Sequence, residues 1–312
     1  MKIQILLILT LIGTILSAPM EAETPTEPED VESLVVFASN RGDDPNALGL
    51  YILDTETLEI TPLETDFDAN LFPKWSPDGE QVLFTVPGEW NLYTILADGT
   101  EITQITDFRS ANADWAPDGS QIVFQSDHDD EPEDTPDVYV IDLVEETLVE
   151  LVDLPEVPDF SPRWSPDGSQ IMFISARTGN FEIFLMNPDG TDPIQITDSS
   201  TPIFNAAWSP DGEQIAYPFP TGEQSMELFL INKDGSPDSI VQLTEDDEYN
   251  TSPAWSPDGE KIVFRSDRGG NPDLWMINVD GTDLVQLTDD EYYDDFPDWG
   301  PKNLFEFEIP EE

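Results

Sequence analysis

Acidic and aromatic residues stand close together in several segments between the short apolar runs of this 312-residue chain. Carboxylates in such segments could act as a general acid and base, hold a cation, or bind a basic peptide, and neighbouring aromatic rings suit peptides and sugars. We expect these side chains to be exposed on loops; the alternative is that the rings pack onto sheet edges while the acids only solvate the rim. The candidate binding residues are Phe108, Phe160, Asp246, Tyr249, Tyr292, Tyr293, Asp294 and Phe296.

A repeat must position these residues. The motif W-S-P-D-G, or a close variant, recurs at tryptophans that are 40, 49, 44, 47 and 44 residues apart, and this interval is typical of a four-stranded propeller blade. Within each repeat, short β-rich runs are bounded by turn residues. The P-D-G aspartate is interpreted as part of a turn, because a catalytic aspartate there would have to recur in every blade. The tryptophans are Trp75, Trp115, Trp164, Trp208, Trp255 and, in a degenerate copy, Trp299.

The two ends of the repeat array complement each other. The first repeat has predicted strands at residues 34–39, 50–53 and near 58–61 but lacks an innermost strand, whereas residues 295–299 form an unmatched innermost strand. Joining them closes a ring without open sheet edges. The sequence therefore predicts an all-β fold, a six-bladed β-propeller over residues 34–312 with a composite blade. The role of the alternating segment 304–309 stays open.

The repeat also resembles a known family. W-S-P-D-G is followed by I-x-F-x-S-x-R-x-G, an aromatic-apolar strand, N-x-D-G-T and a final Q-L-T or Q-I-T, most clearly over residues 165–197 and 256–288. This pattern resembles the TolB-type, WD-like β-propeller repeat. Similar repeats are found in periplasmic TolB, in peptidase propeller domains and in oligogalacturonide lyases, so the resemblance implies a fold and leaves function to be argued from the site.

The chain departs from each of these relatives. About thirty residues precede the first predicted strand, too few for the α/β domain of TolB. The peptidase relatives need a G-x-S-x-G nucleophile motif, which this sequence does not contain. The resemblance to the lyases implies a metal enzyme with several histidines, whereas this chain has only His128, in an acidic insert. We therefore expect no catalytic residues and no metal ligands. The acidic clusters could instead bind Ca²⁺, but no D-x-[DN]-x-[DN]-G loop accompanies them.

The amino terminus predicts export. Met1-Lys2 precede an apolar run over residues 3–16, and small residues follow it, so residues 1–18 read as a secretory signal peptide and residues 19–33 as an acidic, Pro/Thr-rich disordered tether. The absence of cysteine excludes a lipoprotein anchor and disulfides. We expect a periplasmic or extracellular protein that stays near a membrane only if the signal segment is not cleaved.

A formal net charge of −56 excludes a general nucleic-acid binder, because phosphates would be repelled. It fits either a saline habitat or cation binding. Arg41, Arg177 and Arg268 are expected to pair with carboxylates within the chain.

The functional interpretation is an exported, non-enzymatic binding scaffold for a protein partner, either basic or bridged by cations. The alternatives are a hydrolase or lyase acting on a polysaccharide or glycoside, and a cation-dependent carbohydrate-binding module. Two carboxyl groups facing each other across the channel would favour an enzyme.

Overall fold

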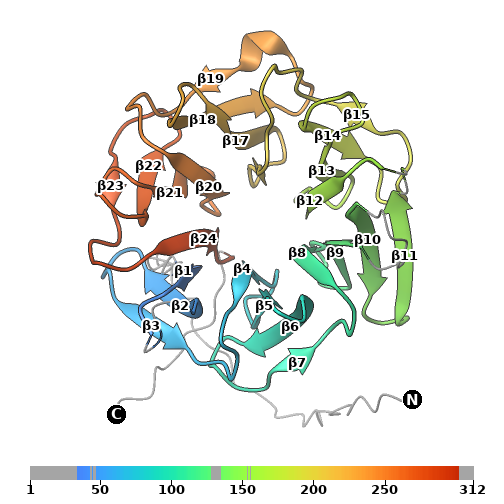
Figure 1. The fold of residues 1–312 in the computed structure, drawn as a ribbon, viewed down its shortest axis with the longest axis horizontal. Helices are drawn as coiled ribbons and strands as arrows, with labels where there is room; N and C mark the ends of the chain where they lie inside the picture. Colours follow the sequence, from blue (N-terminus) through green and yellow to red (C-terminus); the bar gives the residue numbers. More distant parts are fainter. Residues whose placement is uncertain are drawn as a thin grey trace, which may run out of the picture. The chain divides into compact units, whose positions relative to one another are not determined.

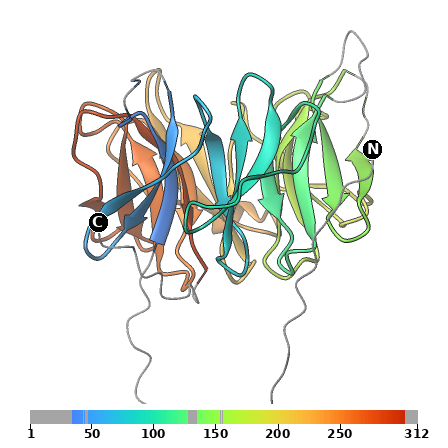
Figure 2. The same cartoon turned by 90° about the horizontal axis from the view of Figure 1, so that it is seen from below.

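The computed structural model describes residues 34–301, with gaps at 43, 45–46, 128–134, 153 and 155. The predicted signal peptide, the tether and segment 304–309 lie outside the described residues. Within the described part, 24 strands form six four-stranded antiparallel sheets, which radiate around a central channel as the blades of a propeller (Figure 1). Seen edge-on, the strands run from one face of the ring to the other (Figure 2).

Each blade is numbered by the position of its innermost strand in the chain. Blade 1 comprises β4 (Leu71–Trp75), β5 (Gln81–Val86), β6 (Asn91–Leu96) and β7 (Thr103–Gln104). Blade 2 comprises β8 (Ser110–Trp115), β9 (Gln121–Ser126), β10 (Asp137–Asp142) and β11 (Thr147–Val152). Blade 3 comprises β12 (Asp159–Trp164), β13 (Ile171–Ser175), β14 (Glu182–Met186) and β15 (Ile194–Gln195).

Blades 4 and 5 comprise β16 (Ala207–Trp208), β17 (Gln214–Pro220), β18 (Met226–Asn232) and β19 (Val241–Gln242); and β20 (Asn250–Trp255), β21 (Lys261–Ser266), β22 (Asp273–Asn278) and β23 (Val285–Gln286). Blade 6 comprises β24 (Asp294–Trp299), β1 (Leu34–Ser39), β2 (Gly49–Asp54) and β3 (Ile60–Leu63). The one helix assigned to the described residues is the 3-10 turn η1 (Pro237–Ser239), and no helix there is long and apolar enough to cross a membrane.

Blade 6 confirms the predicted composite blade. Strand β24 pairs antiparallel with β1, with Trp299 opposite Val35 and Asp294 opposite Ser39. The first and last described strands thus share one sheet, so the innermost strand that the first repeat lacks comes from the end of the chain. The all-β, six-bladed prediction is correct.

The P-D-G segments form the turns that the sequence predicts. In blade 1, Ser76 Oγ donates to Asp78 Oδ1 at 2.6 Å, and the same oxygen accepts the backbone N–H of Glu80 at 3.0 Å. Gly79 takes a φ of 73°, in the left-handed region that glycine tolerates. In blade 3, a hydrogen bond from the Ser169 side chain is the main reason why the pKa of Asp167 falls to about 2. These aspartates organise turns.

The motif tryptophans pack between neighbouring blades. Trp164 of blade 3 shares a buried cluster with Val123 and Val138 of blade 2, and Trp299 of blade 6 shares one with Val263 of blade 5. Each cluster therefore contains side chains from two sheets, so a blade completes its core only beside its neighbour. A fully buried phenylalanine on the second strand of five blades fills the same layer: Phe37, Phe84, Phe124, Phe173 and Phe264.

Removal of β24 tests closure of the ring. We expect a chain that ends at residue 293 to lose several kcal/mol of unfolding free energy relative to a chain that ends at residue 301, because it lacks a paired strand and the buried Trp299 ring together. Thermal unfolding followed by circular dichroism measures the difference. Equal melting temperatures for the two chains would contradict the composite blade.

Candidate functional site

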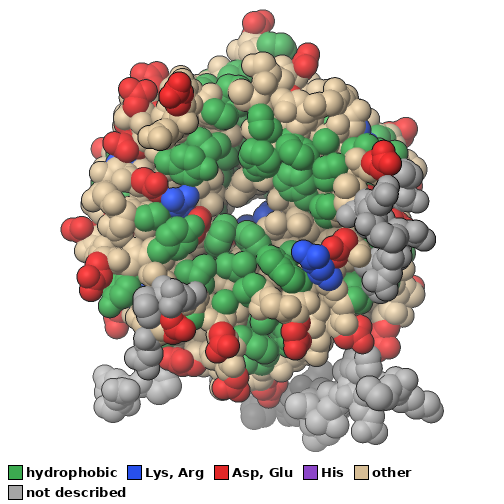
Figure 3. Space-filling model, in the orientation of Figure 1, with side chains coloured by type: hydrophobic (Ala, Val, Ile, Leu, Met, Phe, Trp, Pro, Cys, Tyr) green, Lys and Arg blue, Asp and Glu red, His purple; other side chains and the backbone are tan. Residues whose placement is uncertain are grey.

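The connections between strands divide the propeller into two faces. The turns that join the first to the second strand of each blade, and the third to the fourth, lie on one side, which we call the turn face. The longer loops, including those from one blade to the next, lie on the other, which we call the loop face. The predicted binding residues belong to the loop face. Apolar side chains surround the channel opening on this face, while acidic ones lie mainly towards its periphery (Figure 3).

Bulges near the loop face shape the channel opening. In each of the five bulged innermost strands, the pairing register with the next strand shifts, and one residue other than glycine takes a positive φ. Such a conformation costs on the order of 1–3 kcal/mol, and bulges commonly redirect side chains next to functional sites. The five residues are Phe72 (φ 53°), Asn112 (51°), Ser161 (51°), Ser252 (53°) and Phe296 (56°).

Two of these strained residues are aromatic and contact each other. Phe72 of blade 1 and Phe296 of blade 6 both line the channel, and their rings meet edge to face with centroids 4.5 Å apart. Asn112, by contrast, donates its side-chain amide to Gln125 at 3.0 Å, and Ser252 donates its hydroxyl to Asp295 at 2.7 Å. The bulge residue thus forms a side-chain hydrogen bond in blades 2 and 5, whereas in blades 1 and 6 it contributes one ring of an aromatic pair.

A second aromatic group surrounds Phe160, another of the predicted residues. Its ring lies 5.2 Å from that of Phe181, which lies 5.4 Å from that of Phe204. Phe160 and Phe181 are partly buried against the core of blades 3 and 4, whereas Phe204 is 50% exposed. Two rings of this group pack on the core and the third, Phe204, is exposed to solvent, which is typical of a contact surface.

Arg265 brings two predicted tyrosines together. Its guanidinium carbon lies 5.2 Å from the centre of the Tyr249 ring and 5.4 Å from that of Tyr293, a cation–π arrangement with both. Nη2 of Arg265 donates to Asp267 at 2.8 Å. We did not predict Arg265 from the sequence; the available signal was a charged residue directly after the apolar run I-V-F of β21 (Lys261–Ser266).

Asp295 accepts a hydrogen bond from one member of this stack, Tyr293. The carboxylate accepts the Tyr293 hydroxyl and the Ser252 hydroxyl, each at 2.7 Å, and the backbone N–H of Phe296 at 2.7 Å. Burial raises the pKa of Asp295, and the hydrogen bonds from Tyr293 and Ser252 oppose that rise. Because Tyr293, Asp295 and Phe296 belong to one short stretch of chain, the tyrosine–arginine stack and the phenylalanine pair adjoin at β24.

Two predicted acids pair with arginines of the same chain. Asp294 is fully buried and accepts two hydrogen bonds from Nη2 of Arg41, at 2.9 and 2.7 Å. Asp246 forms an ion pair of 2.7 Å with Arg268. The expectation that Asp294 is an exposed contact is therefore corrected: its partner, distant in the sequence, draws it into the sheet. The expected internal pairing of Arg41 and Arg268 is observed, as is that of Arg177, with Asp159 at 3.1 Å.

The last two predicted residues take supporting positions. The Tyr292 ring lies beside the Arg41 guanidinium, 5.6 Å from its carbon to the ring centre. Phe108 packs at the edge of the blade 1–blade 2 core, 6.1 Å from the Phe124 ring. For Phe108 the structure thus shows the packed arrangement that we named as the alternative, and for Tyr249 it shows an exposed one, with 37% of the residue accessible.

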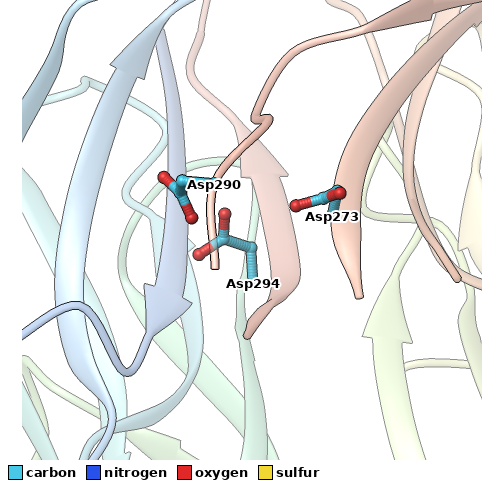
Figure 4. Close-up of side chains that lie close together, drawn as sticks. All are labelled: Asp273, Asp290 and Asp294. Atoms are coloured by element: carbon cyan, nitrogen blue, oxygen red, sulfur yellow. The ribbon is translucent and has the colours of Figure 1, made fainter. Parts of the chain in front are cut away.

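Three carboxylates near Arg41 are the cluster that most resembles a cation site in the described residues. One oxygen from each of Asp273, Asp290 and Asp294 lies within 4.8 Å of the others (Figure 4). Arg41 already supplies the positive charge, 3.3 Å from Asp290 and 2.7 Å from Asp294. Asp273 accepts the side-chain amide of Gln286 at 3.0 Å. Burial, followed by the charge of Asp294, raises the pKa of Asp273 to about 6.

Two further carboxyl groups, Asp114 and Asp298, line the central channel. Asp298 accepts Lys74 Nζ at 2.6 Å and the backbone N–H of Trp75 at 2.8 Å, while Asp114 accepts the backbone N–H of Trp164 at 2.9 Å. Burial raises the pKa of Asp114. Each carboxylate therefore links one blade to the next.

Comparison with known proteins places the fold. The TolB beta propeller domain profile matches residues 202–305. The chain is similar to TolB from Acinetobacter baumannii, with a TM-score of 0.73 and 21% identity over 88% of this chain and 68% of that one. It is also similar to a putative TolB from Agrobacterium tumefaciens, with a TM-score of 0.66 and 18% identity over 88% of this chain and 100% of that one. A third similar structure is an oligogalacturonate lyase from Vibrio parahaemolyticus, with a TM-score of 0.55 and 16% identity over 82% of this chain and 74% of that one. The resemblance to TolB-type propellers is confirmed, and at these identities it establishes the fold.

The raised pKa of Asp273 gives a testable pH dependence. The folded protein holds this proton up to about pH 6, whereas the unfolded chain releases it near 3.8, so the contribution of Asp273 to stability falls as the pH rises between these values. We expect Asp273→Asn to raise the unfolding free energy by on the order of 1 kcal/mol at pH values above 7 and to lose that advantage progressively as the pH falls from about 6 to 3.8. Urea unfolding across the pH range measures it; a constant difference would contradict the assignment.

Melting temperatures in CaCl₂ and NaCl distinguish specific calcium binding from general screening of carboxylate repulsion. Because the Arg41 guanidinium already pairs with two of the three clustered carboxylates, Asp290 and Asp294, we expect CaCl₂ to raise the melting temperature no more than NaCl of equal ionic strength. Both salts should stabilise the chain by reducing repulsion among its carboxylates. A melting-temperature increase specific to micromolar Ca²⁺ would show that a calcium site exists.

Proposed function

We propose that this chain is an exported, non-enzymatic binding scaffold that holds a protein partner on its loop face. The observation that carries the proposal is the Tyr249–Arg265–Tyr293 stack, which adjoins the Phe72–Phe296 pair at the channel opening. Tyrosine and arginine are enriched among the residues that dominate binding energy at protein interfaces, and packing holds these side chains in place before a partner arrives.

Exposed apolar surface on the same face supports a protein partner. Phe204 is 50% exposed, and its ring packs against that of Phe181, which in turn packs against Phe160. An apolar centre with acidic residues around it matches the usual arrangement of an interface core and its polar rim. The acidic rim and the net charge of −56 favour a basic partner, or one bridged by cations, and repel nucleic acid.

Export rests on the amino-terminal residues. A short basic start, an apolar run and the small residues Ser17 and Ala18 support a signal segment and a periplasmic or extracellular location. The acid-rich composition suits a secreted protein in a saline medium. Retention at a membrane would require that the signal segment stay uncleaved.

Action on a polysaccharide is the alternative, together with cation-dependent carbohydrate binding. The likeness to an oligogalacturonate lyase and the raised pKa of Asp114 favour it. Against it, Asp298 is bound to Lys74 and both channel carboxylates accept backbone N–H groups, so neither is free in the way that a glycosidase acid and base require.

Paired substitutions test the loop-face proposal. We expect the double variant Phe204→Ser with Tyr249→Ser to recover a partner from extracts of the source organism at least about tenfold less well than the unaltered chain, because both exposed rings are lost. The control is Val149→Ser on β11, which has the same exposed fraction as Phe204, 50%, but lies in the outermost strand of blade 2. Affinity capture with mass spectrometry, and thermal unfolding of each variant, provide the measurements.

The opposite pattern would contradict the proposal. If Val149→Ser loses the partner while the double variant keeps it, binding occurs at the rim of the ring. If the unaltered chain degrades oligogalacturonate and Asp114→Asn does not, the polysaccharide function replaces the scaffold.

A further inference from the structure

Six equivalent positions form a ring inside the channel. The residue before each motif tryptophan pairs with the same position of the second strand in every blade, and all six line a cavity of about 330 Å³. In order around the ring, starting from blade 6, they are Asp298, Lys74, Asp114, Arg163, Ala207 and Ala254. Four consecutive blades thus contribute charges of alternating sign, and the next two contribute only methyl groups.

The first three charges are satisfied within the protein. Lys74 and Asp298 form an ion pair of 2.6 Å, and both aspartates accept a backbone N–H from the following blade. Charges that alternate around a ring neutralise one another, which is how buried ionic groups are normally tolerated.

Arg163 differs from every other described arginine. Its Nη1 donates to the backbone carbonyls of Asn112 at 3.0 Å and Pro162 at 2.8 Å, but no described carboxylate lies within 4.0 Å, whereas the remaining described arginines each have an ion-pair partner. A guanidinium carries five N–H donors, so the Nε and Nη2 donors of Arg163 have no acceptor among the described residues. The charge of Asp114 on the preceding blade acts on Arg163, but no described carboxylate accepts a hydrogen bond from it. Guanidinium donors left without an acceptor in a cavity point to an anionic ligand.

The apolar side of the ring lies between Arg163 and Asp298. Ala207 and Ala254, with the neighbouring Ala206 and Pro253, form this part of the cavity wall. A ligand with a negative group beside Arg163 and a positive group towards Asp298 would continue the alternation of charge around the ring. Its apolar part would contact the alanines and the proline.

We propose that the central channel binds a small zwitterion with an apolar body, either an aliphatic α-amino acid or a dipeptide. A free anion would be repelled by the net charge of −56, while a zwitterion has no net charge to repel. The cavity volume lies at the lower end of the range for small-molecule sites, which suits a ligand of this size. This site is separate from the partner surface on the loop face and does not depend on it.

Isothermal titration calorimetry with four probes tests the charge requirement. L-Leucine and L-leucyl-L-leucine carry both charges at different separations, N-acetyl-L-leucine keeps only the carboxylate, and L-leucinamide keeps only the amine. We expect one or both zwitterions to bind with a Kd of about 1 mM or tighter and both blocked compounds to bind at least tenfold more weakly. The stronger of the two zwitterions identifies the amino acid or the dipeptide as the ligand class.

Two variants place the binding in the channel. Ala254→Leu fills the apolar side and leaves all four charges, and Arg163→Gln removes the anion partner; we expect each to weaken the better zwitterion by at least about tenfold. Arg109→Gln is the matched control, since Arg109 is 61% exposed and pairs with Asp127 outside the cavity.

Three results would overturn the proposal. They are no binding of either zwitterion up to about 10 mM, equal binding of N-acetyl-L-leucine, and unchanged binding to a folded Ala254→Leu chain. The partner-surface substitution Phe204→Ser should leave zwitterion binding unaltered, so failure of the loop-face proposal would be recognised separately.

Discussion

Packing between neighbouring blades is the interaction on which the rest of the structure depends. Each sheet exposes apolar side chains that only the next sheet covers, and the motif tryptophans join side chains from two blades in one cluster. Such an array leaves an uncovered sheet at each end unless it closes. The pairing of β24 with β1 closes it, so the two ends of the repeat array have to meet before the last core cluster exists.

Closure also separates the roles of the two faces. On the turn face, the glycines of tight turns press against the preceding blade: a Cβ on Gly190 would come within 2.2 Å of the Leu151 carbonyl oxygen, and one on Gly235 within 2.8 Å of that of Ile196. Little can change there without moving two blades. On the loop face the closest such contacts are with side chains of the same blade, as for Gly269 with Asp273 Oδ2 at 2.7 Å. Its bulges present phenylalanine in one blade and serine in another. Variable recognition surfaces on a rigid ring are therefore expected on the loop face.

Local and periodic features were predictable, and long-range pairs were not. The repeat interval and turn chemistry predict the blades, and the missing first strand predicts the composite one. The burial of Asp294 depends on Arg41, 253 residues away, and no spacing rule identifies that contact. The repeat makes the residue before each motif tryptophan equivalent from blade to blade, yet only distances show that Arg163 has no described carboxylate within 4.0 Å. The bulges had an unused signal: a proline two residues before the tryptophan in four blades, as in Phe72-Pro73-Lys74-Trp75.

The placement of positive charge explains why the two proposed sites would select different ligands. Four described arginines have side chains only 10–15% exposed, and each is held by internal carboxylates or aromatic rings, so the acidic excess of the chain stays on its surface. If the loop face binds a partner, as we propose, that field would favour basic proteins and make association sensitive to salt. Inside the channel, two cations and two anions cancel. Recognition there depends on where opposite charges lie within one small ligand, because the channel residues themselves add no net charge.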